Sequence, residues 1–327
     1  MTMQGGSLHM AVATTTPFII GMRDAFFDAL YPIFVKDSNA VLITADNGAP
    51  SLDKFAQNLP DQFYNVGIAE QQMMGLACGM AFEGKKVYTY AIAPFVTLRC
   101  YEQNKLDMCA MNLPIVNLGV GAGYAYDIMG PSHHTVEDIS VMRTLPNLVI
   151  HSPADSVSAA ALAQISYEEP SPQYIRFDRA GIPELYRGRE IDFNEGVVLI
   201  KGGKDLCIIA TGIMVHQALK VADNLEEKGL KVGVMDLYRL KPINKDLLFK
   251  HLQGVRRVVT LEEHLLAGGM GSAIAEIFID EGFDRLMLRI GQDDKFVFDY
   301  GGRQVIWEKY GLDVASITTR ISNWIGL

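Results

Sequence analysis

Short runs of apolar and β-branched residues alternate with helix-like segments along most of the chain. Apolar runs of about 4–8 residues bounded by turn residues are typical of strands buried on both faces of a sheet. The predicted strands of the first half cover residues 40–46, 86–93, 114–121, 147–153 and 172–177. Because strands that alternate with helices form parallel sheets covered on both faces, the first half is predicted to be a mainly parallel α/β domain.

A polar stretch that contains glycine and proline, residues 178–196, interrupts this alternation. Such stretches are typical of domain boundaries, and we place the boundary between residues 187 and 188. Further predicted strands cover residues 205–212, 231–237, 256–264 and 285–291. The sequence thus predicts an α/β fold of two doubly wound domains, a mainly parallel first domain at 16–187 and a smaller second domain at 188–327. Residues 1–15, which begin MTMQGGSLHM, are similar to an expression-vector remnant and are expected to be disordered.

Composition narrows the class of function. The 327 residues are 49% hydrophobic, enough for two domains with their own cores, and the net charge is -9. In the absence of a long Lys/Arg cluster, this charge argues against a nucleic-acid or anionic-membrane surface. No apolar run approaches the roughly 18 residues that span a bilayer. The four cysteines lack metal-ligand spacing, which fits a reducing compartment. We therefore expect a cytoplasmic protein whose partners are small molecules or proteins.

Glu70 stands out because it heads an otherwise apolar helix. In FYNVGIAEQQMMGLACGMAFEG, residues 63–84, small residues allow another backbone to approach and methionines leave no polar face, so burial on nearly all sides is expected. A glutamate in a first helical turn often only interacts with unpaired backbone N–H groups. In an apolar setting, however, a carboxylate needs a hydrogen-bond partner or a raised pKa, and either can make it a catalytic acid. The pattern alone leaves both interpretations open.

Recognisable motifs lie beyond the carboxyl ends of the predicted strands, where open α/β sheets bind ligands. They are TADNGAP (44–50), NVGIAEQ (65–71), APFVTLRCYEQ (93–103), GPSHHTVEDISVMRTLPNLVIHSPAD (130–155), YIRFDRAGIP (174–183) and LEEHLLAGGMGSAIAE (261–276). In order and approximate spacing, these segments resemble the C-terminal part of transketolase. The resemblance covers nearly the whole chain after the N-terminal remnant.

The resemblance implies a thiamine diphosphate enzyme. Family members have three α/β domains, of which the first grips the diphosphate and its magnesium ion and the second holds the aminopyrimidine ring. This chain resembles the second, pyrimidine-binding domain and the third, C-terminal domain. The family's diphosphate signature, GDG followed some tens of residues later by Asn, is not found in the sequence. We therefore expect no metal site on this chain, and a separate N-terminal subunit that carries the GDG…N site for the diphosphate and Mg²⁺. A homodimer of this chain would then form the centre of an α2β2 heterotetramer.

For Glu70, the resemblance implies a catalytic role. The matching glutamate of the family hydrogen-bonds N1′ of the aminopyrimidine and favours its imino tautomer, which removes the proton from C2 of the thiazolium ring. A buried carboxyl group that keeps or shares its proton suits this role. The implied activity is transfer of a two-carbon ketol unit from a ketose or ketose phosphate to an aldose acceptor.

Further candidates for the site follow from the same resemblance. His133, in GPSHH, matches a histidine at the substrate end of the family's site and is expected to exchange protons with substrate oxygens. His134 is the weaker candidate, because adjacent residues seldom point to one place. Phe95 or Tyr101 is expected to pack on the pyrimidine, whereas Leu98 occupies the position where many transketolases have the stacking ring.

A substrate phosphate would need a planar cation. The arginines at suitable positions are Arg99, Arg176 and Arg179. Many relatives carry an acidic residue four positions before the histidine, where this chain has Met129, with Asp127 two residues earlier. Asp127 is therefore a candidate substrate ligand, and a modified or non-phosphorylated substrate stays open.

Two further motifs have weaker links to chemistry. Asp46 matches an aspartate near the cofactor in relatives, although it also suits the turn that closes TADNG. LEEHLLAGGMGS, residues 261–272, resembles the third-domain signature of the family. Its Glu262, Glu263 and His264 are assigned to a domain or subunit contact and not to catalysis.

Three other functions compete with this hypothesis. The β subunit of a 2-oxo acid dehydrogenase E1 has the same two domains and decarboxylates an oxo acid, but the segment GPSHHTVEDISVMRTLPN favours transketolase. Deoxyxylulose-phosphate synthase also contains GIAEQ, but it normally carries all three domains in one chain. The last alternative is a non-catalytic scaffold paralogue, against which the presence of both Glu70 and His133 argues.

Overall fold

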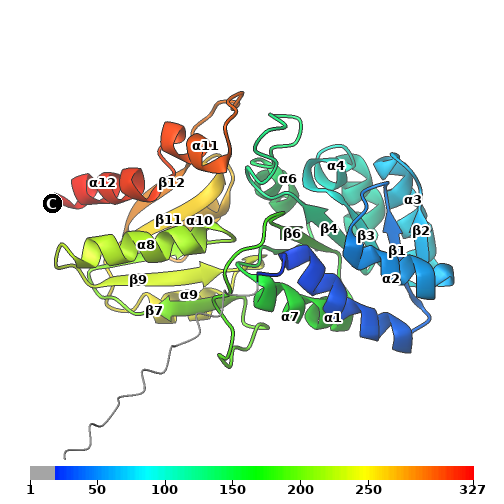
Figure 1. Cartoon of the computed structure of the whole chain (residues 1–327). Helices are drawn as coiled ribbons and strands as arrows, with labels where there is room; N and C mark the ends of the chain where they lie inside the picture. The colour runs from blue at the N-terminus through cyan, green and yellow to red at the C-terminus, as the bar shows by residue number, and fades with distance from the viewer. Residues whose placement is uncertain (1–18) are drawn as a thin grey trace, which may run out of the picture.

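The structure, a computed structural model, describes residues 19–327, which form two α/β domains side by side (Figure 1). The predicted vector remnant at 1–15 lies outside the described residues. The predicted fold class, two domains each built on a mainly parallel sheet with helices, is confirmed. No helix within residues 19–327 combines the length and the apolar character that crossing a bilayer requires.

The first domain is built on a seven-stranded sheet with the strand order β10-β5-β6-β4-β3-β1-β2. Its strands are β1 (Ala40–Thr44), β2 (Phe63–Asn65), β3 (Lys86–Ile92), β4 (Ile115–Val120), β5 (Val149–His151), β6 (Gln173–Phe177) and β10 (Arg239–Lys241). All pairs among β1 to β6 are parallel, whereas β10 comes from the second half of the chain and pairs antiparallel with β5. The second domain therefore contributes an edge strand to the sheet of the first.

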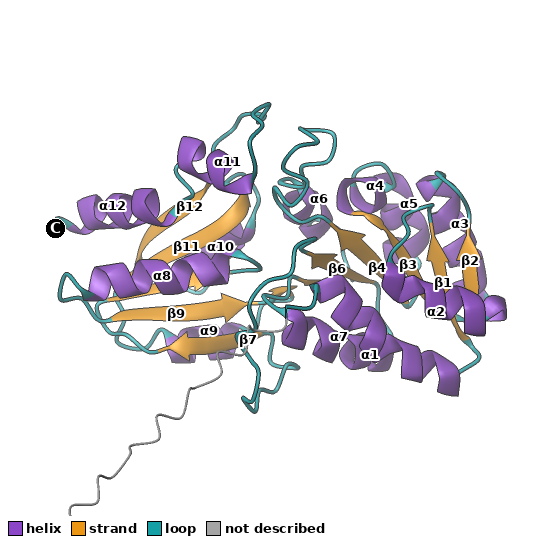
Figure 2. Cartoon of the chain, viewed as in Figure 1, coloured by secondary structure: helices purple, strands orange, loops and turns teal. Residues whose placement is uncertain are grey.

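Helices cover both faces of this sheet, as the ribbon view shows (Figure 2). One face carries α1 (Met22–Lys36), α2 (Pro50–Asn58) and α7 (Ser156–Glu168). The other carries α3 (Glu70–Phe82), α4 (Ala93–Thr97), the π-helical turn η2 (Asn104–Ala110) and α6 (Asp138–Arg143). The short η1 (Pro60–Gln62) and α5 (Tyr101–Gln103) complete the domain. Alternate strand residues supply the two cores, since Leu42 packs with α1 whereas Val41 and Ile43 pack with α3.

The second domain has a five-stranded sheet with the order β12-β11-β8-β9-β7. Its strands are β7 (Val197–Lys201), β8 (Leu206–Ala210), β9 (Val232–Leu237), β11 (Arg257–Leu265) and β12 (Leu286–Gln292), and only the pair β7–β9 is antiparallel. One face carries α8 (Met214–Glu226), α11 (Arg303–Tyr310) and α12 (Val314–Ile325), and the other carries α9 (Lys245–His251) and α10 (Met270–Asp280). The domain is therefore also doubly wound.

The segment between β6 and β7 is held by hydrogen bonds to both domains. The carboxylate of Asp155, at the N-terminus of α7, accepts hydrogen bonds from the backbone N–H groups of Leu185 and Tyr186 at 2.7 and 3.0 Å. The Tyr186 hydroxyl donates to the buried Asp236 of β9 at 2.6 Å. Burial raises the pKa of Asp236 to about 8. We propose that the two domains divide within this segment, which contains the predicted boundary between residues 187 and 188.

Candidate active site

Glu70 is the first residue of α3, at the edge where the parallel strands of the first sheet end. The turn before it is fixed by Asn65, whose side-chain oxygen accepts hydrogen bonds from the backbone N–H groups of Asp46 and Gly67. Gly67 has φ +74°, a conformation that favours glycine. As a result, the Glu70 side chain points inward and the residue is only 3% exposed.

The buried charge of Glu70 is compensated by one arginine. Nη1 of Arg99 donates a hydrogen bond to Oε2 of Glu70 at 2.6 Å. The Arg99 side chain itself is 43% exposed, so this ion pair lies at the boundary between the core and solvent. Such an arrangement keeps a carboxylate buried while leaving its partner replaceable from outside.

The helix that carries Glu70 is less enclosed than the sequence indicated. Met73, Met74 and Ala77 are buried, but the opposite face, with Gly75 and Gly79, is exposed, and a Cβ added at either glycine would have no atom within 4 Å. The expected burial on nearly all sides is therefore wrong for the single chain. The small residues instead leave an open surface that another chain can approach closely.

Contacts between rings and cations connect Glu70 to the predicted substrate histidine. The Arg99 guanidinium lies 4.1 Å from the centre of the Phe95 ring, and His133 contacts the same ring edge-on with centroids 5.3 Å apart. His133 also contacts Tyr126, at 5.8 Å. Partial burial and the positive charge of Arg99 lower the pKa of His133, so its imidazole is neutral at neutral pH.

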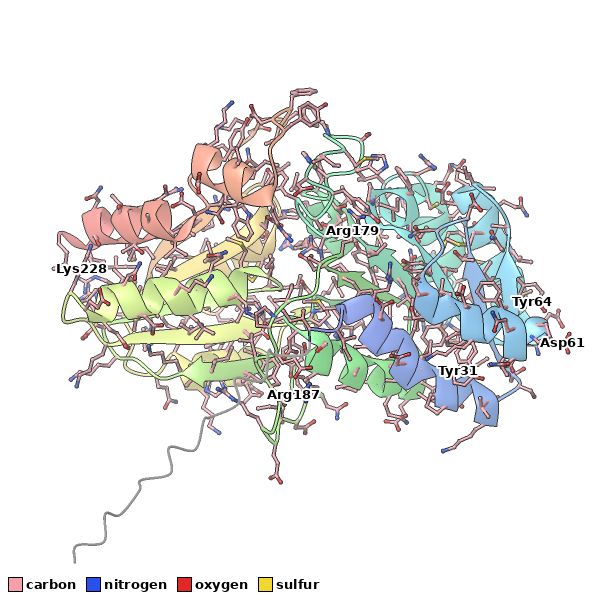
Figure 3. All side chains as sticks on the ribbon, in the orientation of Figure 1. Tyr31, Asp61, Tyr64, Arg179, Arg187 and Lys228 are labelled. Carbon is pink, nitrogen blue, oxygen red and sulfur yellow. The ribbon has the colours of Figure 1, made fainter. Side chains whose placement is uncertain are left out.

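Arg179 lies at the far end of this row of contacts. Its guanidinium is 5.0 Å from the centre of the Tyr126 ring, and the residue is exposed. Figure 3 shows it near the junction of the two domains. Within residues 19–327, Arg179 has no carboxylate partner at salt-bridge distance, so its charge is available to an anion.

Arg176, two strand positions after Tyr174, is placed differently. The residue is 5% exposed and its guanidinium donates two hydrogen bonds to Asp138, at 2.7 and 3.1 Å, and another to the carbonyl of Thr135. The Tyr174 hydroxyl binds the same carboxylate at 2.7 Å. The predicted phosphate-binding role does not fit Arg176, because its donors are used inside the protein. Arg179, on the loop that follows β6, is exposed instead.

The adjacent histidines point to different places. The ring of His134 is buried and packs edge-on against Tyr124, with centroids 5.0 Å apart, and its Nε2 has no partner within the described chain. The ring of His133 lies among Phe95 and Tyr126, with Nδ1 2.9 Å from the hydroxyl of Ser132. Only His133 joins the row of contacts that leads to Glu70.

The other candidates for the cofactor site stand apart from that row. The Tyr101 hydroxyl donates to the carbonyl of Val141 at 3.1 Å, so its ring is held against α6. Leu98 is exposed, and Asp46 is an exposed residue with φ +55° in the turn after β1. Among the candidates for stacking, Phe95 is therefore the one whose ring lies beside both Arg99 and His133.

Asp127 faces the second domain. Its carboxylate accepts a hydrogen bond from the backbone N–H of Arg303 at 2.9 Å, whereas Met129 of the same loop is exposed. Sequence reasoning did not single out Tyr126 or Arg303. No local signal distinguishes either residue, since their contacts are made across long separations in the chain.

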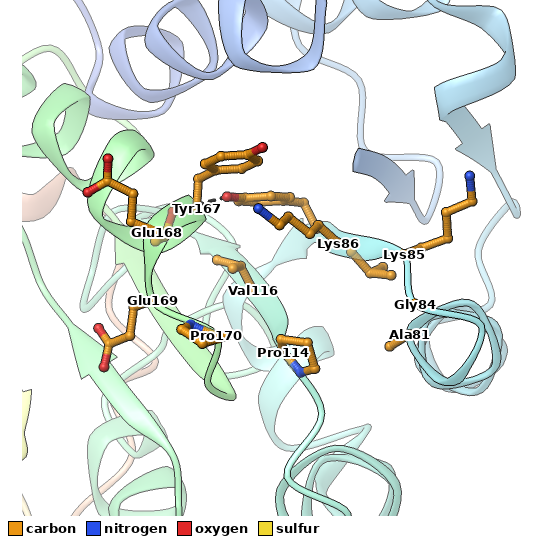
Figure 4. A pocket seen from close by; sticks show the side chains of 13 residues that line it. Ala81, Gly84, Lys85, Lys86, Pro114, Val116, Tyr167, Glu168, Glu169 and Pro170 are labelled. Atoms are coloured by element: carbon orange, nitrogen blue, oxygen red, sulfur yellow. Dashed lines mark hydrogen bonds between the residues drawn. The ribbon is translucent and has the colours of Figure 1, made fainter. Parts of the chain in front are cut away.

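The site lies on an open edge, whereas a groove of about 380 Å³ lies at the opposite edge of the first sheet (Figure 4). That groove runs between the beginnings of β3 and β4 and the end of α7. Lys85, Lys86, Tyr167, Glu168 and Glu169 line it, together with apolar residues. None of the predicted site residues takes part in it. The open edge therefore offers functional side chains without a complete cavity around them.

The residues at the open edge fit an aminopyrimidine ring. A buried carboxylate with an exposed, replaceable partner can hydrogen-bond a ring nitrogen, and the half-buried Phe95 offers a face or edge to the same ring. For a metal ion, the described residues contain no group of three or more His, Cys, Asp or Glu side chains that could hold one. The edge thus suits the ring portion of the expected cofactor.

Comparisons with known proteins agree with this organisation. Residues 19–184 match the family model of the transketolase pyrimidine-binding domain, and residues 195–317 match that of the transketolase C-terminal domain. One of the subunits of an apulose-4-phosphate transketolase from Phocaeicola vulgatus is 34% identical over 301 residues, which cover 91% of this chain and 96% of that protein. A 1-deoxy-D-xylulose-5-phosphate synthase from Caldanaerobacter subterraneus is 36% identical over 91% of this chain and 48% of its own length.

A solved structure gives the same result. A split-gene transketolase, described as an inactive β4 tetramer, superposes with a TM-score of 0.83 at 33% identity, over 94% of this chain and 98% of that one. The two matching family models follow one another along the chain and together span both domains. The chain belongs to the transketolase family and has the domain composition of a transketolase-type C-terminal subunit.

Proposed function

We propose that this chain is the C-terminal subunit of a two-component, thiamine diphosphate-dependent transketolase. It would transfer a two-carbon ketol unit from a ketose donor to an aldose acceptor. The observation that carries the proposal is the buried carboxylate of Glu70, which lies at the carboxyl edge of the sheet and is connected through Arg99 and Phe95 to His133. A scaffold protein would have no need to keep a buried charge at an open edge.

In this proposal Glu70 binds the aminopyrimidine. Its carboxyl group would exchange the hydrogen bond from Arg99 for one with the ring nitrogen N1′ and share a proton there. Phe95 would pack against the ring that replaces the guanidinium. Thiamine diphosphate, when bound, supplies the thiazolium ring that accepts electrons while a bond next to a carbonyl is broken. The protein's part is to orient the cofactor and to set its protonation state.

His133 and Arg179 would contact the sugar substrate. A neutral imidazole can take a proton from a substrate hydroxyl and return it, and the lowered pKa of His133 keeps it neutral at physiological pH. The exposed guanidinium of Arg179, beside Tyr126, would bind a phosphate or another anionic group at the far end of the substrate. Both side chains contact the Tyr126 ring, which places the imidazole and the guanidinium close enough for one sugar substrate.

The remainder of the site would come from a partner subunit that carries the GDG…N signature and holds the diphosphate and Mg²⁺. Exposed apolar side chains beside the candidate residues support a covering partner: Ile68, Leu98, Ile128 and Met129. The small-residue face of α3 adds a surface for close contact. We propose an α2β2 assembly with a homodimer of this chain at its centre, located in the cytoplasm.

Calorimetry with thiamine diphosphate and Mg²⁺ tests this proposal. The isolated chain is expected to bind the cofactor weakly or not at all, whereas a mixture with the partner subunit is expected to bind it and to convert ketose donors and aldehyde acceptors. Tight binding to the isolated chain would contradict a shared site. A mixture that forms a complex and binds the cofactor, but in which Glu70→Gln has full activity, would contradict the catalytic role and favour the scaffold.

A second candidate is a reaction of the deoxyxylulose-phosphate synthase type, since one such enzyme is 36% identical to this chain. That reaction, like that of a 2-oxo acid dehydrogenase E1, starts with decarboxylation of an oxo acid. Release of CO2 from pyruvate by the two-subunit complex, with no conversion of ketoses, would favour these alternatives. Aldehyde-dependent consumption of a ketose without CO2 would favour the transketolase reaction.

A further inference from the structure

The loop that carries His133 is closed at its base by a backbone bridge and is held on one side by the second domain. Gly123 and Thr135 form a two-residue antiparallel bridge, with N–H to O distances of 2.8 and 2.9 Å, that closes the loop 123–135. Figure 1 shows this loop beside the segment that leads into α11, although the two are far apart in the sequence. His133 therefore sits near the end of a closed loop whose anchors fix where its ring can lie.

Glu263 on β11 supplies the first anchor. Its carboxylate accepts a hydrogen bond from the backbone N–H of Tyr124 at 3.0 Å. The approach is so close that a Cβ on Gly123 would lie 1.8 Å from Oε2 of Glu263. The indole N–H of Trp307 and the guanidinium of Arg303 donate to the same carboxylate. Glu263 is 5% exposed and its position is fixed by three groups of donors.

Arg303, the first residue of α11, supplies the second anchor and connects the two domains. Its guanidinium donates to Glu263 with an Nε to Oε1 distance of 2.8 Å and to Asp178, which follows β6 of the first domain. Its backbone N–H donates to Asp127 of the loop at 2.9 Å. Burial alone would lower the pKa of Arg303. The carboxylates of Asp178 and Glu263 outweigh this effect and raise the pKa above its usual value. The side chain is a permanently charged bridge.

Another pair, between Arg143 and Glu276, joins the domains without contacting the loop 123–135. Arg143 of α6 binds Glu276 of α10, with an Nη1 to Oε1 distance of 3.2 Å, and this pair is more exposed. Arg143 thus pairs with a glutamate across the domains, whereas Arg303 pairs with Glu263 inside the second domain and with Asp178 of the first. Only the pair of Arg303 and Glu263 also holds backbone groups of the loop that carries His133. A comparison of variants at Arg143 and Arg303 therefore distinguishes the effect of domain attachment from that of loop placement.

We propose that Arg303 is a positioning residue for the active site: with Glu263, it clamps the 123–135 loop so that His133 faces the substrate. The proposal rests on the proposed function and assigns the second domain a part in it. Displacement of a catalytic group by about 1 Å can reduce the rate by roughly 10²-fold. The clamp gives the second domain control of catalysis without any contact between that domain and the reacting atoms.

Arg303→Lys tests the clamp, with Arg143→Lys as the matched control. A lysine keeps the positive charge but cannot donate to Glu263 and Asp178 with the same fork geometry. In hydrogen exchange followed by mass spectrometry on the isolated chain, peptides from 123–135 are expected to exchange about 10-fold faster in Arg303→Lys and unchanged in Arg143→Lys. In the two-subunit complex, kcat of Arg303→Lys is expected to fall about 10- to 100-fold, with thiamine diphosphate affinity within about 3-fold of the parent.

Exchange and kcat like those of the parent in Arg303→Lys would overturn the proposal. Equal effects of Arg303→Lys and Arg143→Lys would also overturn it, because they would indicate a general loosening of the domains. Equal losses of cofactor affinity and kcat would also count against positioning. If Arg303→Lys does not fold, Glu263→Gln decides by the same readouts, since its amide oxygen still accepts from Tyr124. The exchange measurement needs no cofactor. If the parent complex has no activity, the proposed function is wrong, but the exchange of residues 123–135 still tests the clamp.

Discussion

Arg99 donates a hydrogen bond to Glu70 at 2.6 Å while its guanidinium lies 4.1 Å from the centre of the Phe95 ring. One arginine therefore contacts both side chains, Glu70 and Phe95, that we propose as contacts of the aminopyrimidine. The guanidinium of Arg99 and the aminopyrimidine would compete for these two side chains, because both are planar and carry nitrogen atoms. Arg99 is 43% exposed and can move into solvent, so the buried carboxylate has a charged partner before the cofactor arrives.

Replacement of Glu70 by glutamine is expected to reduce the activity of the two-subunit complex by roughly 10²- to 10⁴-fold, since an amide cannot share a proton with the ring nitrogen. The measurement is the steady-state rate with a ketose donor and an aldehyde acceptor. Glu83→Gln is the matched control, because Glu83 is the exposed glutamate at the other end of α3. A full rate in Glu70→Gln would contradict the assigned role.

The pH dependence of the reaction is expected to report His133. Partial burial and Arg99 lower its pKa from 6.5, so the imidazole stays neutral until the pH falls below that value. If it acts as a base, kcat/KM should be constant at neutral pH and decrease only at a pH below 6.5. His133→Gln should reduce the rate and remove this acidic limb. A limb that persists in the variant would have to come from another group.

His264 is expected to make folding sensitive to acid. Burial lowers its pKa to about 4, and its ring, with Nδ1 2.8 Å from the carbonyl of Leu265 and Nε2 3.4 Å from the backbone N of Ser140, is held as a neutral donor and acceptor. In the unfolded chain this imidazole takes up a proton near pH 6.5. The stability that the neutral, buried ring provides is therefore complete above that pH and is lost as the pH falls toward 4. The contribution is about 3 kcal/mol. Denaturant unfolding of the parent and His264→Gln should give a stability difference that shrinks between about pH 7 and 4.5; a constant difference would contradict it.

Two glycines of the His133 loop are expected to differ in their tolerance of alanine. Both have positive φ, +60° at Gly123 and +71° at Gly130, and this conformation costs an alanine about 1–2 kcal/mol. Only at Gly123 would the new Cβ meet a buried carboxylate, that of Glu263, at 1.8 Å. Gly123→Ala should therefore lower the free energy of unfolding by about 2 kcal/mol more than Gly130→Ala. Equal losses would mean that Glu263 moves freely.

The partner subunit is expected to cover Ile68, which is 78% exposed and lies two residues before Glu70. Ile68→Glu should weaken association with the partner at least about 10-fold, because a charge would be buried at the contact. The melting temperature of the isolated chain should hardly change, since the side chain is in solvent. Ile279→Glu, at a 79% exposed position on α10, is the control for added charge. Equal affinity for both variants would place the interface elsewhere.

Much of the architecture was predictable because its signals are local. The long buried strands are continuous apolar runs, and α3 begins at Glu70 as its pattern indicates. The strands that escaped prediction include β2 and β10, which have three residues each and too little sequence to show a period. Strand β10 pairs with β5 of the other domain, a contact that no local pattern can indicate.

The sequence by itself determined the family, the two doubly wound domains and the candidate residues, since these depend on residue types in a fixed order. Only the tertiary structure decided which candidates share one place. It turned His133 and not His134 toward Phe95, used Arg176 to compensate Asp138 and left Arg179 exposed beside Tyr126. It also brought Arg303 to the loop that carries His133, from more than half the chain away. Side-chain direction and charge compensation depend on neighbours distant in sequence, so they are settled only when the chain packs.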